Sequence, residues 1–374
     1  MSNRVDGVAV RKLSRLRRAA RRPILAAMPV LLAAVTISAC GSASGTSSAS
    51  GAGSGAASGG SHGLTTLKIS AVPFYSNMAL ALGQKVGIFA HYGLKVELET
   101  SSNVNVTLAD LHSGESQLGF ATTPLVLNAD EKGQNVKCVA PMGPANVANP
   151  SFPQNAVIVA KNSTITSLKQ LEGKTVALNQ LAGSNQLYLD IGVTKAGGNP
   201  ANLKLATVPF ADMASALKHG TVQAAFAVPP FIKAGEKAGE TRVLADLDSV
   251  TSPNTQDCYV ATSDYISGHQ SVINRFVQAQ DQSILYAKAH PSEALAQVGA
   301  VSGLSAAAAA ATVPPKLVLT DDLAPGSMIS YQNLMIQAKA LNGSPLTADK
   351  VAYVAPSTPM TKLLFDEGGK FTGS

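Results

Sequence analysis

The stretch from Leu67 to Leu98, LKISAVPFYSNMALALGQKVGIFAHYGLKVEL, decides the fold. Its first six residues are strand-like, and Leu94–Leu98 alternates apolar and polar residues as a half-buried strand does. Between them, Asn77–Val86 has helical spacing and ends at Gly87. Alternation of strands and helices predicts an α/β fold with a parallel-rich sheet and helices on both of its faces.

The same alternation continues along the chain, and a mainly helical part follows it. Further strands are predicted at residues 117–121, 136–140, 156–160, 175–178, 203–208, 224–228 and 259–262. A long helix at 272–289 begins the C-terminal part, which contains further helical segments. The pattern therefore predicts two α/β lobes and a helical C-terminal part.

The positive charge of the chain lies at its N-terminus. The formal net charge is +6, but eight of the 29 Lys and Arg residues precede Cys40, against one acidic residue. The remaining 21 cations and 22 acids leave a body that is almost neutral, so nucleic acid is not an expected partner. Charged residues are only 14% of the chain, which excludes long disordered or coiled-coil classes.

Residues 1–39 have the three parts of an export signal. A cationic stretch ends at Arg22, and the apolar stretch Pro23–Ile37 is shorter than a membrane span and interrupted by Pro29. The sequence ISAC that ends at Cys40 resembles the lipobox of bacterial lipoproteins. The resemblance implies a palmitate-type diacylated Cys40 as the mature N-terminus, anchored on the extracytoplasmic face of the cell membrane.

A flexible tether follows the acylated cysteine, so that residues 40–63 form one segment. It contains eight Gly and eight Ser among the 23 residues 41–63, and its random-coil span is about 25 Å. Two arginine pairs in the leader, Arg17-Arg18 and Arg21-Arg22, leave open whether export uses the general secretory or the twin-arginine route.

Four segments of the body carry a family resemblance, in which Gln117 and Gln223 stand where Asp is usual. Together they resemble the nitrate/sulfonate/taurine and pyrimidine-precursor (thiamine-precursor-like) family of ABC-importer binding proteins, over about residues 67–365. The segments are GIFAHYGLKVE (87–97), LHSGESQLGF (111–120), NSTITSLKQLEGKTVA (162–177) and ALKHGTVQAA (216–225).

This resemblance implies a type II periplasmic-binding-protein fold, with two lobes joined by two crossings near residues 155–162 and 250–262. The first lobe would comprise 64–158 plus 256–374, and the second 159–255. It also implies a monomeric solute-binding lipoprotein, which closes its lobes on a small organic solute and delivers it to an ABC permease and its ATPase. A sulfonate, nitrate or taurine-like solute and a pyrimidine or other aromatic one both stay open.

In open α/β sheets, ligands bind beyond the carboxyl ends of the strands, where helix N-termini point. The loops at those ends contain hydroxyls, amides and aromatic rings but no Lys or Arg. Because a dianion would normally need a cation or an Arg fork, we expect a neutral or singly charged solute. The candidate ligand-binding residues are Phe74, Tyr75, Ser76, Asn77, Ser101, Ser102, Thr122, Thr123, Asn179, Ser184, Asn185, Phe210, Asp212, Pro229 and Phe231.

Each candidate has a structural alternative. The hydroxyls are also suited to helix capping, and the phenylalanines to core packing. Asp212 precedes an apolar-periodic run, so it either caps a helix or faces an amino group of the ligand.

The two cysteines of the body, Cys138 and Cys258, are either a disulfide or two separate buried thiols; an even number of cysteines in an exported protein favours the disulfide. The histidines show no metal-ligand spacing, and neither G-x-G-x-x-G nor a P-loop occurs. The sequence therefore predicts no metal, cofactor or catalytic cluster.

Two other functions fit the same fold. One is an enzyme acting on a pyrimidine or menaquinone precursor, and the other is the sensing subunit of a surface receptor. Export and a lipid anchor argue against the enzyme, because such biosynthesis is cytoplasmic.

Overall fold

The computed structural model describes residues 63–144, 151–181, 183–250, 257–313, 318–337, 341–342, 345–356 and 358–373. The predicted leader, Cys40 and almost all of the tether lie outside these described residues. Within them, no helix is both long enough and apolar enough to cross a membrane.

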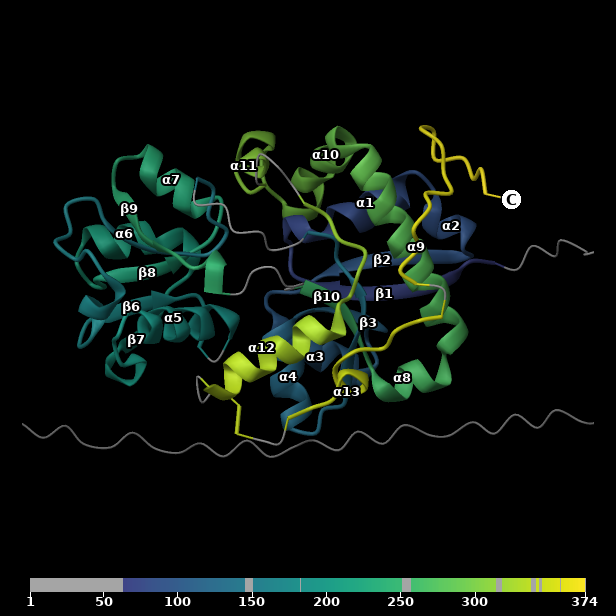
Figure 1. Ribbon diagram of the computed structural model, residues 1–374. Coiled ribbons are helices and arrows are strands. Elements are labelled where there is room, and N and C mark those ends of the chain that lie inside the picture. The colour runs from purple at the N-terminus through teal and green to yellow at the C-terminus, as the bar shows by residue number, and fades with distance from the viewer. Residues whose placement is uncertain are drawn as a thin grey trace, which may run out of the picture. The chain divides into compact units, whose positions relative to one another are not determined.

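Two five-stranded sheets organise the described chain (Figure 1). In spatial order, the first contains β2 (Leu94–Thr100), β1 (Thr65–Ala71), β3 (Leu118–Thr122), β10 (Asp257–Thr262) and β4 (Val136–Pro141). The second contains β7 (Lys204–Thr207), β6 (Thr175–Leu178), β8 (Ala224–Ala227), β5 (Ala156–Ala160) and β9 (Thr241–Asp246). The predicted two-lobed α/β fold is confirmed.

One strand in each sheet runs against its neighbours. The pairs β1–β2, β1–β3, β6–β7 and β6–β8 are parallel, whereas β10 is antiparallel to β3 and β4, and β5 is antiparallel to β8 and β9. The chain passes from the first sheet to the second between β4 and β5, and returns between β9 and β10. The first passage therefore precedes residue 156, earlier than the 155–162 expected, because β5 already belongs to the second sheet.

The C-terminal part of the chain completes the first lobe. Helix α9 packs on α1 and β4, α10 packs on α1, and α12 packs on α4. The helices of this lobe are α1 (Met78–Lys85), α2 (Ile88–His91), α3 (Val104–Ser113), α4 (Thr123–Glu131), α8 (Ser263–Gly268), α9 (Gln270–Ala289), α10 (Pro291–Ser302), α11 (Ala306–Ala310), α12 (Pro325–Gln337) and α13 (Ala348–Val351), with the 3-10 turn η1 (Tyr75–Asn77).

The second lobe has shorter helices around its sheet. They are α5 (Ser184–Lys195), α6 (Met213–Lys218) and α7 (Phe231–Lys237), with the 3-10 turns η2 (Leu168–Leu171), η3 (Pro200–Asn202), η4 (Phe210–Asp212) and η5 (Asp248–Val250). Strand β9 was not among the strands predicted from the sequence.

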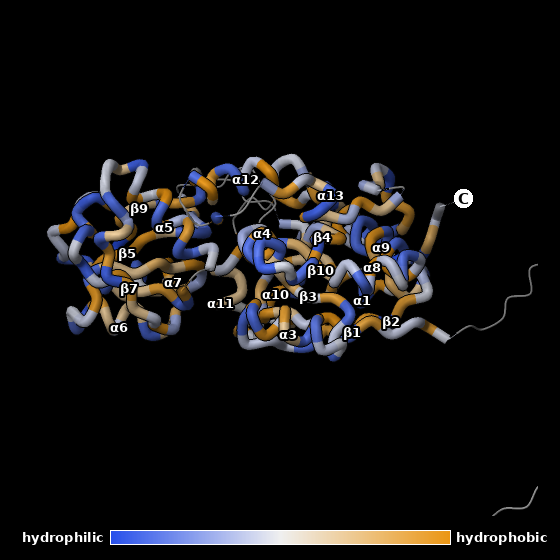
Figure 2. The backbone as a smooth tube through the Cα atoms, turned by 90° about the horizontal axis from the view of Figure 1, so that it is seen from below, coloured by the Kyte–Doolittle hydropathy of each residue, from blue (hydrophilic) through white to orange (hydrophobic). Residues whose placement is uncertain are grey.

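Apolar side chains form the core of each lobe. Along the backbone, many of the hydrophilic residues lie on the outer loops (Figure 2). In the first lobe, the ring of Phe276 on α9 packs on Phe89 and Tyr259, with ring centres 5.9 and 5.5 Å away. In the second, Tyr188 packs on Phe226. Burial of each such ring stabilises the fold by roughly 1.5–3 kcal/mol.

Two glycines of the segment 87–97 explain its spacing. Gly87 and Gly93 have φ angles of 84° and 69°, in the left-handed region that L side chains rarely adopt. Gly87 lies between α1 and α2, and Gly93 immediately precedes β2. Arg275 of α9 approaches the second turn and donates to the carbonyls of Tyr92 and Gly93 at 3.1 and 3.2 Å, so a Cβ atom at Gly93 would also displace the Arg275 side chain.

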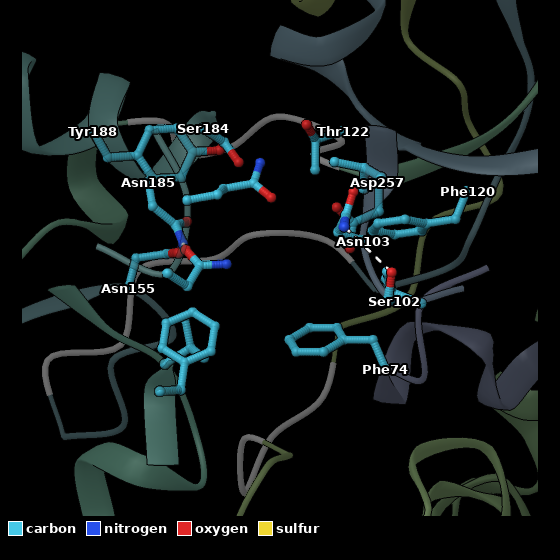
Figure 3. Close-up of a pocket in the computed structure, with 16 residues that line it drawn as sticks. Phe74, Ser102, Asn103, Phe120, Thr122, Asn155, Ser184, Asn185, Tyr188 and Asp257 are labelled. Atoms are coloured by element: carbon cyan, nitrogen blue, oxygen red, sulfur yellow. Dashed lines mark hydrogen bonds between the residues drawn. The ribbon is translucent and has the colours of Figure 1, made fainter. Parts of the chain in front are cut away.

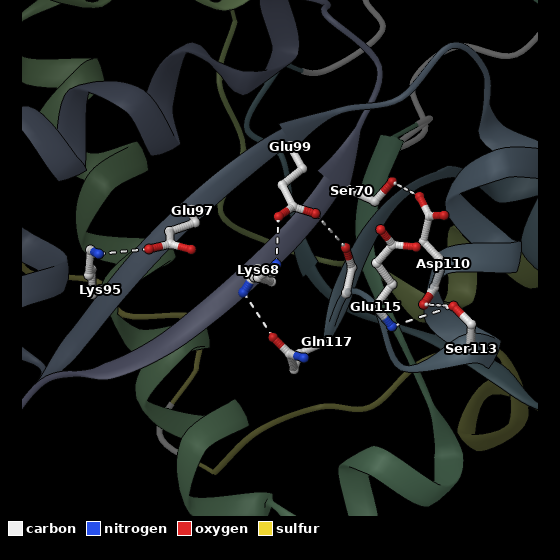
Figure 4. Close-up of polar contacts among 10 residues, drawn as sticks. Lys68, Ser70, Lys95, Glu97, Glu99, Asp110, Ser113, Glu115 and Gln117 are labelled. Atoms are coloured by element: carbon white, nitrogen blue, oxygen red, sulfur yellow. Dashed lines mark hydrogen bonds and ion pairs between the residues drawn. The ribbon is translucent and has the colours of Figure 1, made fainter. Parts of the chain in front are cut away.

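The two glutamines that replace the family's usual Asp have the same role in the two lobes. The Gln117 side-chain oxygen accepts from the backbone N–H of Lys68 in β1 at 2.9 Å (Figure 4), and the Gln223 oxygen accepts from the N–H of Thr175 in β6 at 3.0 Å. The backbone N–H of each Gln donates back to the same residue's carbonyl, at 3.0 and 2.9 Å. An amide oxygen thus provides the acceptor that a carboxylate would provide.

We predict that Gln117→Leu and Gln223→Leu each lower the free energy of unfolding by about 1–2 kcal/mol, because each leaves a backbone N–H at the strand edge without its acceptor. Urea denaturation measures the change. Gln117→Glu keeps an acceptor oxygen and serves as the control; an equal loss in the Leu and Glu variants would show that this hydrogen bond is not the cause.

Cys138 of β4 and Cys258 of β10 form a disulfide, with Cα atoms 5.7 Å apart. Both residues are buried, and their strands are antiparallel neighbours in the first sheet. The structure thus contains the bridge rather than two separate thiols. Since β4 precedes the first passage and β10 follows the second, the disulfide joins the two strands between which the whole second lobe is inserted.

Candidate functional site

A cavity of about 310 Å³ lies where strand ends of the two sheets face each other. This volume is in the range of small-molecule sites. Figure 3 shows side chains of the first lobe, among them Phe74, Thr122 and Asp257, opposite Ser184 and Asn185 of the second. The lining residues are Val72, Phe74, Ser102, Asn103, Val104, Phe120, Thr122, Asn155, Asn179, Gln180, Ser184, Asn185, Tyr188, Phe210, Val228 and Asp257.

Seven of the fifteen predicted residues line this cavity, and they come from both lobes. They follow β1, β2 or β6, end β3, begin α5 or lie in η4, as the rule about strand ends requires. In the second lobe, the amide of Asn185 donates to the side-chain oxygen of Asn179 at 2.7 Å. The seven are Phe74, Ser102, Thr122, Asn179, Ser184, Asn185 and Phe210.

Three predicted residues lie behind the cavity and hold its loops. The Asn77 side chain is fully buried, donates to the carbonyls of Val72 and Phe74, and accepts from the Tyr259 hydroxyl at 3.2 Å. The Ser101 hydroxyl donates to the Asn103 carbonyl at 2.8 Å. The Tyr75 hydroxyl donates to the Gln154 side chain at 3.0 Å.

Three more predicted residues, Ser76, Thr123 and Pro229, are buried outside the lining. Phe231 stacks on Phe210 with ring centres 5.7 Å apart, and thereby supports a ring of the cavity wall from behind. Packing is thus the role that the structure gives to Phe231.

Asp212 is exposed, does not line the cavity and makes no capping hydrogen bond at the start of α6. Asp212 thus occupies the predicted N-cap position of α6 without a capping hydrogen bond, and it lies outside the cavity in which a ligand contact was the alternative.

The cavity also includes residues that were not predicted, among them Asn155 and Asp257. Asn155 immediately precedes β5, and Asp257 begins β10. Both strands are the antiparallel members of their sheets, so their amino ends lie at the edge where the parallel neighbours have their carboxyl ends. The other residues not predicted are Val72, Asn103, Val104, Phe120, Gln180, Tyr188 and Val228.

Asp257 is the acidic group of the lining, and its charge is poorly compensated. Burial raises the pKa of its carboxyl to about 7, and the neighbouring Ser76 side chain lowers it somewhat. Among the described residues, no Lys, Arg or His forms an ion pair with Asp257. Near neutral pH this carboxyl is therefore poised between its neutral and its charged form.

The buried carboxyl of Asp248 in η5 links two segments of the chain. Asp248 follows β9, just before the second passage, and its partners lie just before β5, at the end of the first passage. It accepts from the backbone N–H groups of Gln154 and Asn155 at 2.7 and 2.8 Å, and from the Asn155 side chain at 2.9 Å. Burial raises the pKa of Asp248 to about 6, although these hydrogen bonds oppose the rise. The two passages between the lobes are thus linked to each other twice: by the disulfide at their first-lobe ends and by Asp248 at their second-lobe ends.

The start of α5 gives the second lobe a set of hydrogen-bond donors. Gly183 precedes the helix without a side-chain cap, and the next two residues, Ser184 and Asn185, line the cavity. At the start of α3 the situation differs, because the Asn103 side chain accepts from the N–H groups of Asn105 and Val106. Free N–H groups at a helix start suit an oxygen acceptor on a ligand.

Comparison with known proteins shows the family. The model of the NMT1/THI5-like family matches residues 76–294, which is more than half of the chain, so the chain belongs to this family. The predicted resemblance is thereby confirmed. None of the curated proteins matches the chain in sequence.

Solved structures show the same periplasmic-binding-protein fold. The ligand-binding component of an ABC-type import system from Staphylococcus aureus, with zinc bound, is 17% identical over 79% of this chain and 99% of that one, with a TM-score of 0.65. The aliphatic sulphonate-binding protein SsuA from Escherichia coli is 20% identical over 80% and 96%, at 0.61. The nitrate-binding protein NrtA from Synechocystis is 12% identical over 77% and 86%, also at 0.61. In the described part of this chain, no group of three His, Cys, Asp or Glu residues could hold a metal ion.

Proposed function

We propose that this protein is the extracytoplasmic solute-binding component of an ABC importer. The observation that carries the proposal is the cavity itself, because its wall is divided between two lobes that are joined by two passages. A solute that contacts both walls stabilises the closed arrangement of the lobes, which an ABC permease and its ATPase would then recognise. The fold and the binding-protein names of the similar structures support this function.

The test is to purify the protein from its own cells under non-denaturing conditions and to measure its mass by native mass spectrometry. We expect a mass excess of one small molecule, which is released on unfolding, and a loss of that excess in Phe210→Ala, which opens the wall of the cavity. A protein that never carries a small molecule and turns over an added pyrimidine would support the enzyme instead.

The attachment to the membrane belongs to the same proposal. The lipobox-like sequence before Cys40 and the Gly/Ser-rich residues 41–63 would keep a monomeric binding protein within reach of its permease. Two acyl chains are sufficient for stable anchoring, whereas one is marginal.

We predict that Cys40→Ala moves the protein from the membrane fraction to the soluble extracytoplasmic fraction, because it removes the acylation site. Fractionation of cells that produce the wild type or the variant measures this. Ser42→Ala, two residues further along, is the control and stays with the membrane. If Cys40→Ala stays as well, the lipid anchor is excluded.

A further inference from the structure

The charge of the solute can be inferred from the groups that surround it. Among the sixteen lining residues there is one carboxyl, that of Asp257, and there is no Lys, Arg or His. The only formal charge that the described lining residues offer to a ligand is therefore negative.

The aromatic part of the cavity wall also favours a cation over an anion. Phe74 and Phe120 of the first lobe and Tyr188 and Phe210 of the second all line the cavity. The face of an aromatic ring carries partial negative charge, so it attracts a cation and repels an anion. Four rings beside one carboxylate form an environment in which an organic cation with an apolar or planar body is favoured.

The remaining polar groups are compatible with such a ligand. The amide and hydroxyl oxygens of the lining, such as those of Asn155 and Thr122, can accept hydrogen bonds from N–H groups of the ligand. The uncapped start of α5 can receive an oxygen atom of the solute, but its partial charge is about half of a unit charge. The full charge available on Asp257 outweighs it.

We propose, on the basis of the solute-binding function above, that the solute is a small organic cation whose charged nitrogen binds the Asp257 carboxylate while its apolar or planar body lies among the four rings. This class differs from the anions that the sulphonate- and nitrate-binding proteins are named for. It also gives the half-buried carboxyl of Asp257 a partner, without which its charge is costly.

The proposal predicts a pH dependence of binding. Besides Ser76, the titratable groups that feel the charge of Asp257 are Tyr75, Tyr188 and Tyr259, and the carboxyl of Asp248 acts on the first two of these tyrosines. Burial raises the pKa of all three tyrosines, so they stay neutral. Because a cation binds the ionised form of Asp257, affinity falls about tenfold per pH unit below pH 7 and is constant at about pH 8–9.

The experiment uses benzamidinium and phenethylammonium as probes, with benzenesulfonate and 3-phenylpropionate as anions of similar size. Thermal unfolding of the full chain without the acylation site (Cys40→Ala) is followed at about pH 8, and the affinity of any stabilising probe is measured by calorimetry. The variants are Asp257→Asn and, as the matched control, Asp212→Asn, which makes the same change at an exposed position outside the cavity.

We expect at least one cationic probe to stabilise the wild type and Asp212→Asn, and its affinity to fall by about 100-fold or more in Asp257→Asn. The anions should not stabilise the protein. Stabilisation by an anionic probe, an equal effect of the cation in Asp257→Asn, or no stabilisation by either cation would overturn the proposal.

The solute that co-purifies with the protein separates this proposal from the function on which it rests. A co-purified molecule that contains a positively charged nitrogen supports both. One without such a nitrogen overturns the assignment of the ligand class but leaves solute binding in place, and a cavity that never contains a solute counts against the proposed function itself.

Discussion

Replacement of Cys138 and Cys258 by Ser should lower the free energy of unfolding by about 4–5 kcal/mol. The disulfide closes a loop with a sequence separation of 120 residues, and the chain-entropy model assigns about that much to a loop of this length. The loop contains the entire second lobe, from β5 to β9. Without the bridge, the unfolded chain gains freedom over that whole segment, while the native hydrogen bonds between β4 and β10 stay in place.

Urea denaturation of the double variant, in a chain that also carries Cys40→Ala, measures this loss. Thiol titration of Cys40→Ala in denaturant provides the control, and it should find no thiol without reductant and two after reduction. Two thiols without reductant would show that the cysteines are not bridged. A stability change below about 1 kcal/mol in a protein whose bridge is demonstrated would contradict the entropic argument.

The second large effect concerns the pH dependence of stability in the solute-free protein. Burial raises the pKa values of Asp257 and Asp281 to about 7 and those of Asp130, Asp190 and Asp248 to about 6. Because the unfolded chain has the ordinary, lower pKa values, the folded state binds more protons between about pH 4 and pH 7. The free energy of unfolding should therefore fall as the pH rises through this window.

Asp257→Asn isolates the contribution of the cavity carboxyl. The variant cannot ionise there, so relative to the wild type it should gain up to about 2–3 kcal/mol between pH 5 and pH 8, at about 1.4 kcal/mol for each pH unit below a pKa near 7. Denaturation curves at the two pH values measure this gain. Asp212→Asn, the same change at an exposed position outside the cavity, is the matched variant for comparison. A wild type that becomes more stable from pH 5 to pH 8 would contradict the assignment.

The same substitution, Asp257→Asn, should have opposite effects on the stability of the fold and on the binding of a cation. Asp257→Asn should stabilise the empty protein at pH 8 while it weakens the binding of a cation. A carboxyl that destabilises the fold and binds the ligand is common at functional sites. An unfolded variant cannot show this pair of results, so the combination also excludes simple misfolding.

The fold followed from local patterns because most of its strands have strong apolar runs. The predicted strand 156–160 coincides with β5, and 175–178 with β6. Strand β9, with the sequence TRVLAD, was missed because only one of its residues is fully buried and its polar neighbours hide the alternation. Its place at the sheet edge depends on pairing with β5, a contact that is distant in sequence.

The site was predicted where the rule about carboxyl ends of parallel strands applies, as for Phe74 and Asn179. Asn155 and Asp257 were missed because the directions of β5 and β10 follow from the passages between the lobes and not from local sequence. Asn77 and Ser101 were over-interpreted, since their polar side chains serve the loops behind the wall. An Asp next to a cysteine at the start of a strand was the available signal for Asp257.

The central claim is that the two lobes close on a solute. The most direct measurement is small-angle X-ray scattering of Cys40→Ala, once with its co-purified solute and once after the solute has been removed by unfolding and refolding with the disulfide intact. We predict a smaller radius of gyration for the loaded protein, and a return to that value when the solute is added back. An equal radius of gyration with and without a demonstrably bound solute would contradict the account.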